Sequence, residues 1–166
     1  MKKRGFTLVE ILIVIAIIAS IIAIAIPNYL SARQRALDVK TKSDMAAIKD
    51  ALRLYYNDFN SYPPSAAPGK LSGCGAAGTA LCPCTAGGSD FATGAACENV
   101  YMKQTPTGLG STILYSLSTL RTDDFCMGSL LSNQSDPDII ASQTRCFGAC
   151  SNKYPSPNTK YWACAD

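Results

Sequence analysis

The chain has 166 residues, of which 48% are hydrophobic and 16% charged, and its formal net charge is +3. This length suits one domain plus an apolar segment. The small net charge argues against nonspecific binding of nucleic acid, which usually needs a strongly basic surface. The chain has no histidine and no G-x-S-x-G, H-E-x-x-H or P-loop motif. We therefore expect a protein that is not an enzyme and that holds no cofactor.

An apolar segment follows a short basic leader at the N-terminus. Residues 11–26 contain nine isoleucines and one hydroxyl group, that of Ser20. Counted from Phe6, the segment would form a helix of about 31 Å, which is roughly the thickness of a bilayer's hydrocarbon core. It can therefore span a membrane. Glu10 is unusual in this position, because a charge in lipid is costly and usually has a partner.

Three simpler interpretations of the segment remain open. It could be a plain membrane anchor, or a secretory signal peptide with Ala23-Ile24-Ala25 as its cleavage site. Neither interpretation explains Glu10. A buried helix of a soluble protein is disfavoured, because the segment is apolar on every side.

One long helix is predicted from Phe6 to Phe59. No glycine interrupts this stretch, and Pro27 should bend the helix without ending it. Turn-forming residues and two prolines at 60–64 should end it. Beyond the proline the pattern is amphipathic, with one apolar stripe: Met45, Ile48, Leu52, Tyr55 and Phe59. A helix of roughly 80 Å is too long for the rest of the chain to cover, so its apolar half should protrude into lipid or against other subunits.

The stretch Gly5-Phe6-Thr7-Leu8-Val9-Glu10 behind a basic leader resembles the class III signal sequence of type IV pilins and type II secretion pseudopilins. The resemblance continues to about Pro64 and includes Pro27. It implies that a prepilin peptidase cuts on the cytoplasmic side after Gly5, that Phe6 becomes N-methylated, and that Glu10 is needed for filament assembly. Removal of residues 1–5 would leave equal numbers of basic and acidic side chains.

A physical role for Glu10 follows from this processing. The freed amino group of Phe6 would be a cation at the end of an apolar rod, and a carboxylate four residues on could neutralise it within a subunit or between neighbours. An unpaired charge in a helix bundle costs several kcal/mol, so this pair could set the register of assembly. The simpler alternative is that Glu10 only reaches the membrane interface.

The remaining chain predicts a Cys/Gly-rich loop followed by a sheet. Residues 65–110 have few large apolar side chains and would need disulfides to hold a shape. Alternation predicts a strand over 112–120, a turn at 121–124 and an antiparallel return over 125–131. Short strands are also predicted at 143–147 and 160–164. We therefore predict an α+β fold, in which a three- or four-stranded antiparallel sheet packs on the apolar stripe of the helix.

Eight cysteines lie outside the apolar segment: Cys74, Cys82, Cys84, Cys97, Cys126, Cys146, Cys150 and Cys164. In an exported domain this density predicts disulfides. Zinc is disfavoured, because the chain lacks histidine and a pair of C-x-x-C knuckles. We favour pairing within the first four cysteines and within the last four. Many members of the resembled family carry only two cysteines.

Two further groups of residues could bind ligands. Some major pseudopilins bind calcium in a C-terminal loop, and the candidate oxygen ligands here are Asp123, Asp124, Asp136 and Asp138. Solvated acids in turns are the favoured alternative. Tyr154, Tyr161 and Trp162 lie beside Lys153 and Lys160 and could bind sugars or single-stranded DNA. Packing of a terminal strand is the favoured alternative for these aromatic residues.

Together these observations predict a prepilin, the precursor of a structural subunit of a type IV pilus-like filament. A type II secretion pseudopilin is the close alternative, and a secreted or membrane-anchored disulfide-rich binding domain is the rival from another class. The expected partners are related pilin subunits, a prepilin peptidase, inner-membrane assembly machinery and lipid. The subunit would cross the inner membrane once before it joins an extracellular or periplasmic filament. The expected parts are a leader (1–5), a transmembrane and assembly helix (6–27), an amphipathic helix half (28–60), a loop (61–110) and a sheet with a C-terminal loop (111–166).

Overall fold

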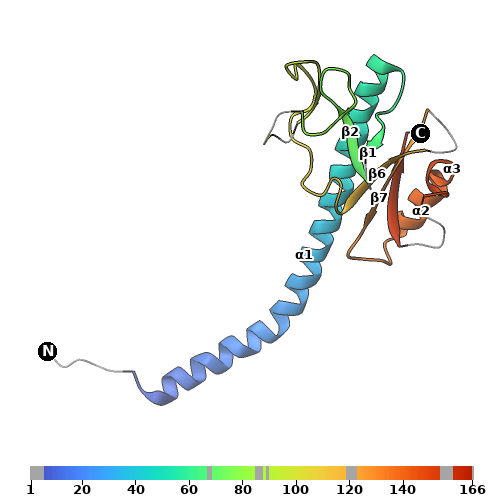
Figure 1. The fold of residues 1–166 in the computed structure, drawn as a ribbon. Coiled ribbons are helices and arrows are strands. Elements are labelled where there is room, and N and C mark those ends of the chain that lie inside the picture. Colours follow the sequence, from blue (N-terminus) through green and yellow to red (C-terminus); the bar gives the residue numbers. More distant parts are fainter. Residues whose placement is uncertain are drawn as a thin grey trace. The chain divides into compact units, whose positions relative to one another are not determined.

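The computed structural model describes residues 6–66, 69–84, 88, 90–118, 123–153 and 159–165. The chain divides into two units, residues 1–37 and 38–166. A single helix, α1 (Leu8–Phe59), belongs to both (Figure 1). This confirms the predicted long helix, which continues through Pro27. It ends where Asn60 adopts a left-handed φ of 50°, a conformation that asparagine tolerates better than most residues.

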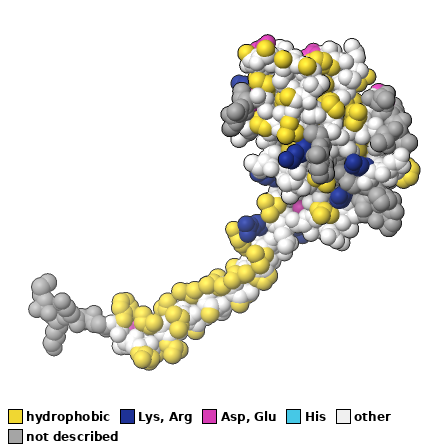
Figure 2. Space-filling model, in the orientation of Figure 1, with side chains coloured by type: hydrophobic (Ala, Val, Ile, Leu, Met, Phe, Trp, Pro, Cys, Tyr) yellow, Lys and Arg dark blue, Asp and Glu magenta, His cyan; other side chains and the backbone are white. Residues whose placement is uncertain are grey.

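The described part of the first unit is helical and wholly exposed. Every described side chain from Phe6 to Leu37 is exposed, including those of the apolar segment, which Figure 2 shows in yellow. The apolar window of this helix has a mean hydropathy of 3.1 and no buried residue. By length and composition, α1 is long and apolar enough to cross a membrane.

The second unit contains a three-stranded antiparallel sheet in the order β6–β7–β8. Its strands are β6 (Ile113–Leu117), β7 (Phe125–Leu130) and β8 (Lys160–Cys164). All three were predicted from the sequence, and β7 returns antiparallel to β6 as expected. Residues 119–122, which include half of the predicted turn, lie outside the described part of the chain.

One face of this sheet packs on the apolar stripe of α1 and forms the main core. From α1 it buries Met45, Ile48, Leu52 and Tyr55 to 3% exposure or less. From the sheet it buries Ile113, Tyr115, Phe125 and Met127. Burial of a large apolar side chain contributes about 1.5–3 kcal/mol, so this contact dominates the stability of the unit. The predicted packing of the sheet on the stripe is confirmed, except that Phe59 at the end of the stripe is 41% exposed.

The segment between α1 and β6 contains five short strands where the sequence predicted a loop. A three-stranded sheet has the order β1–β2–β3, and a two-stranded sheet pairs β4 with β5. The strands are β1 (Ser65–Ala66), β2 (Lys70–Cys74), β3 (Ala80–Leu81), β4 (Phe91–Thr93) and β5 (Asn99–Met102). The expectation that this segment buries little core was wrong in part, because Leu71, Cys74 and Phe91 all belong to the main core. Four of these strands have only two to four residues, which is too short for a visible alternation, and the five-residue β2 is buried at four consecutive positions.

The strand predicted at 143–147 is wrong, because the chain is helical there. The structure has α2 (Pro137–Arg145) followed by α3 (Phe147–Cys150). Asp136 caps α2 by accepting a hydrogen bond from the Asp138 N–H at 2.9 Å, and proline occupies the first turn, where its missing N–H costs nothing. The buried Ser142 hydroxyl of α2 accepts a hydrogen bond of 3.0 Å from the backbone N–H of Trp162 in β8.

Candidate functional site

The start of α1 is built by reciprocal hydrogen bonds between Thr7 and Glu10. The Thr7 N–H and hydroxyl both donate to Glu10 Oε2, at 2.9 and 2.8 Å, and the Glu10 N–H donates to the Thr7 hydroxyl at 3.3 Å. This is a capping box, which satisfies donors that the first turn of a helix leaves without an intrahelical partner. Sequence analysis missed the role of Thr7, although the T-x-x-E spacing was a visible signal for it.

The capping box places the Glu10 carboxylate beside the backbone N–H of Thr7, one residue after Phe6. Its hydrogen bond to the Thr7 N–H keeps a negative charge at the N-terminal end of the helix, where the helix dipole favours it. The Phe6 side chain is 84% exposed. Gly5, the predicted cleavage residue, lies outside the described residues. Glu10 therefore has a structural partner inside its own chain in addition to any partner in an assembly.

All eight cysteines are described, and all eight form disulfides. The pairs are Cys74–Cys82, Cys84–Cys97, Cys126–Cys150 and Cys146–Cys164. They fall within the two groups that the sequence analysis favoured.

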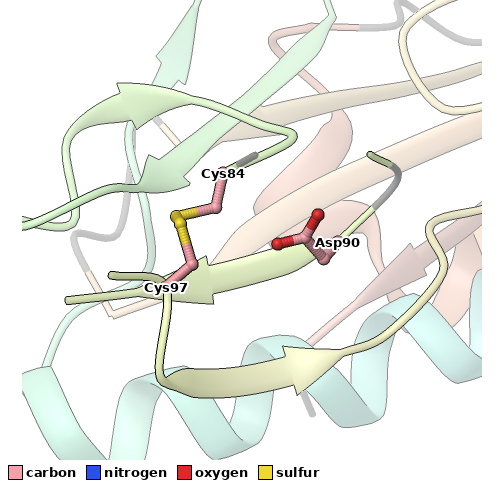
Figure 3. A group of neighbouring side chains, drawn as sticks. All are labelled: Cys84, Asp90 and Cys97. Carbon is pink, nitrogen blue, oxygen red and sulfur yellow. A yellow bond between two sulfur atoms is a disulfide. The ribbon is translucent and has the colours of Figure 1, made fainter. Parts of the chain in front are cut away.

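The first two bridges hold the short strands after α1. Cys74 ends β2 and belongs to the main core, whereas Cys84 and Cys97 are only half-buried. Figure 3 shows Asp90 beside the Cys84–Cys97 bridge, and the ligand atoms of these three residues lie within 4.8 Å of one another. Among the described residues this is the only such group of potential metal ligands. Its sulfurs are bonded to each other, so it offers no thiolate, the form in which cysteine binds metal.

The last two bridges fasten α2 and α3 to the sheet. Cys126 of β7 lies opposite Cys164 of β8, but each is bonded to a helical cysteine instead of to its neighbour. Both bridges surround the fully buried Trp162 in a second core. Successive side chains of a strand point to opposite faces, so this core lies on the face of the sheet that α1 does not cover.

A polar cluster joins α1 to the segment before α2. The buried Asp38 carboxylate accepts hydrogen bonds from the N–H groups of Ser132 and Asn133, at 2.6 and 2.8 Å. One turn later, Lys42 Nζ lies 2.7 Å from the Asp136 carboxylate and 2.6 Å from that of Asp138. We call Asp38, Lys42, Asp136 and Asp138 the clasp. Sequence analysis did not identify Asp38 or Lys42, because their partners are 94 to 96 residues away.

The comparisons with known proteins bear on the N-terminal part of the chain. The family model of the prokaryotic N-terminal methylation motif matches residues 1–26. The type II secretion system core protein G of Escherichia coli is 40% identical over 62 residues, and the type IV wide pilus major component PilA4 of Thermus thermophilus is 48% identical over 64 residues. The N-terminal part of the chain is therefore similar to type IV pilins and to type II secretion system core proteins.

The similarity to these pilins and pseudopilins is confined to a part of each protein. The two matches cover 37% of this chain, and 43% and 47% of the respective relatives. The type IV major pilin protein PilA of Myxococcus xanthus, 36% identical over 61 residues, is covered to 28%. This chain therefore spans less than half the length of the curated relatives that it matches. No solved structure matches it.

The four aspartates considered as calcium ligands do not form one cluster. Asp136 and Asp138 share the Lys42 ammonium, so a cation of the protein itself occupies the position between them. The Asp124 carboxylate accepts hydrogen bonds from the N–H groups of Phe125 and Ala165, at 2.8 and 3.0 Å. Asp123 is exposed.

Two of the three aromatic residues considered as a binding patch, Tyr161 and Trp162, pack against the hydrophobic cores. Trp162 is fully buried, and Tyr161 is half-buried with Lys42 Nζ 5.7 Å from the centre of its ring. Tyr154 lies outside the described residues. For Trp162, packing of the terminal strand is the correct interpretation.

The clasp should make the stability of the subunit depend on pH. Lys42 and the Asp138 N–H hold the pKa of the Asp136 carboxyl below its ordinary value. A depressed pKa contributes stability above the unfolded value of about 3.9, and this contribution is lost as pH falls through the native value. We expect Asp136→Asn, which keeps the helix cap, to be less stable than wild type at pH 7 and closer to it in stability at about pH 3. Urea unfolding of the full chain in detergent at both pH values measures this difference. Lys42→Met should behave in the same way, and a constant difference across pH would contradict the assignment.

Proposed function

We propose that this chain is a prepilin whose mature form is a structural subunit of a type IV pilus-like filament. The observation that carries the proposal is the exposed apolar part of α1, which lies within the residues that match the N-terminal methylation motif. An apolar surface of this extent is not stable in water and marks a site that contacts lipid or other proteins. Lipid would cover it before assembly, and the helices of related subunits would cover it afterwards.

Each residue of the N-terminal segment then has a role. A prepilin peptidase would cut after Gly5, and Phe6 would become the methylated N-terminus. Glu10 would neutralise the new amino group, from a position that its bonds to Thr7 already favour. Pro27 would bend the helix between its apolar half (6–27) and its amphipathic half (28–60). Inner-membrane machinery would move the subunit from the membrane into an extracellular or periplasmic filament.

A pseudopilin of a type II secretion system is the second candidate. It is favoured by the relatives named type II secretion system core protein G, which are 36 to 40% identical over the matched residues. In both candidates the processing and the helix have the same role. The candidates differ in which machinery assembles the subunit and in where the filament lies.

The Gly5→Asp variant tests the proposal through processing. A carboxylate at the cleavage residue should stop the peptidase, so we expect an uncut precursor that stays in the membrane fraction and yields no filaments. Immunoblots of membrane and sheared fractions from cells that carry the assembly machinery measure this. Lys3→Ala, which changes the leader but not the cleavage residue, serves as the control and should be cut normally. Normal filaments from Gly5→Asp would contradict the proposed function.

A further inference from the structure

The outer face of α2 and α3 is apolar and basic. Ile140 is 72% exposed and Phe147 is 58% exposed, although both are large apolar side chains. Between them lie small exposed residues, and a side chain added at Gly148 would meet nothing within 4 Å. Two exposed cations, Arg145 and Lys153, border this surface. We call these residues the basic face: Ile140, Thr144, Arg145, Phe147, Gly148 and Lys153.

Within the described part of the chain, the cations of the basic face form no ion pair. Among the described residues, neither Arg145 nor Lys153 has a carboxylate within 4 Å, in contrast to Lys42. The acids at the start of α2, Asp136 and Asp138, both contact Lys42, at 2.7 and 2.6 Å. The basic face therefore presents positive charge and apolar area together to whatever lies outside the subunit.

A groove with the opposite charge lies between the C-terminal end of α1 and β5. Its volume is about 450 Å³, and none of its lining residues is a lysine or arginine. The acidic groove is lined by Leu54, Asn57, Asp58, Glu98, Asn99, Val100 and Tyr101. Leu54 is 53% exposed and Val100 is 46% exposed, so the groove also offers apolar area.

The carboxylates of the acidic groove are held in place by the fold. The Tyr101 hydroxyl donates to Asp58 Oδ2 at 2.7 Å, and the Ala96 N–H donates to Glu98 Oε2 at 2.9 Å. A fixed charge loses less conformational entropy on binding than a mobile one does. The groove is therefore a pre-organised surface for a cationic, partly apolar partner.

We propose that the basic face of one subunit docks into the acidic groove of a second copy of this chain. The proposal rests on the proposed filament function and names the contact between the globular parts of neighbouring subunits. The two surfaces match in kind, because each combines exposed apolar side chains with two charges, and the charges are opposite. α2 and α3 pack on β8 and β7, whereas the groove lies at the end of α1 and at β5, so the surfaces are distinct (Figure 1). A contact between two different surfaces can repeat from subunit to subunit without closing, as a filament requires.

A charge exchange in the full-length chain tests this contact. Arg145→Glu should place like charges together, and so should Asp58→Lys. Asp58 lies in the last turn of α1, where a lysine suits the helix dipole, so the fold should tolerate this change. We expect each single variant to lower the filament yield at least about tenfold, and the double variant to recover most of it. The yield is the subunit in the sheared fraction relative to the total membrane-bound subunit. Lys70→Glu, which changes the charge equally outside both surfaces, should assemble like wild type.

The outcomes separate this contact from the proposed function. Every variant should first show eight bonded cysteines when denatured without reductant, as evidence that it has folded. Wild-type yields from both single variants, while the unaltered protein forms filaments, would overturn the docking contact alone. A loss in Arg145→Glu that Asp58→Lys does not rescue would overturn the pairing and assign the basic face to another occupant, such as anionic lipid. A wild-type protein that is cut and membrane-bound but never forms filaments would overturn both proposals.

Discussion

Glu10→Ala should nearly abolish filaments and leave the subunit in the membrane, cut and methylated. Without the carboxylate, the amino group of Phe6 would have no counter-charge inside an apolar helix bundle. An unpaired buried charge costs several kcal/mol, so we expect the filament yield to fall at least about a hundredfold. The same change makes the segment more apolar, so insertion into the membrane should not suffer. Comparison of sheared filaments with total membrane-bound subunit measures the loss.

The capping box provides a matched control for this experiment. Glutamine at the third position of a helix preserves a capping box, so Glu10→Gln keeps the hydrogen bonds to Thr7 but removes the charge. We expect Glu10→Gln to fail in assembly almost as severely as Glu10→Ala, and Glu10→Asp to recover part of the yield. Thr7→Ala should lose the cap, worth about 1 kcal/mol, and still assemble. Normal filaments from Glu10→Gln would reduce Glu10 to a helix cap and favour a simple membrane anchor.

Loss of the Cys146–Cys164 bridge should be the most destabilising change in the globular unit. Both sulfurs are almost fully buried beside Trp162, and the bridge fastens α2 to β8. We expect the double variant Cys146→Ser/Cys164→Ser to lower the free energy of unfolding by about 2–5 kcal/mol. Two hydroxyl groups in this apolar core would add to the loss. Urea unfolding of the full chain in detergent, followed by the fluorescence of its single tryptophan, measures the effect.

The Cys84–Cys97 bridge is the matched control for this experiment. Its cysteines are half-buried, and neither is among the buried residues of the two hydrophobic cores. Cys84→Ser/Cys97→Ser should therefore lower the free energy of unfolding by less, and it should leave the environment of Trp162 unchanged. This variant should instead become sensitive to protease between β3 and β5. Equal losses of stability in the two double variants would show that burial around Trp162 adds nothing to the bridge.

The long elements were predictable from the sequence, whereas the short ones were not. α1 and strands β6 to β8 follow a hydrophobic pattern that is sustained over at least five residues. The strands β1 to β5 are defined by disulfides and by tertiary contacts of single residues such as Phe91, which leave no periodic signal. α2 was missed, and a strand was predicted at 143–147, although Asp136-Pro137 is a common start of a helix.

The residues of the candidate site also differ in how far the sequence alone could indicate them. Gly5, Phe6 and Glu10 could be proposed from the sequence because they lie together in one local motif. Asp38 and Lys42 could not be identified, because their roles in the clasp depend on partners that only the fold brings close. The acidic groove likewise arises from segments far apart in the sequence, the end of α1 and β5, whereas the basic face lies within residues 140–153.

The most direct test of the account is the mass of the N-terminal peptide of the exported protein. Cells that carry the assembly machinery should release a chain that begins at Phe6, bears one added methyl group on its amino nitrogen and retains the whole apolar helix. The same peptide should come from sheared filaments and from the membrane pool. A chain that begins at Ile26 would establish a cleaved secretory signal, remove the assembly helix and contradict the filament function.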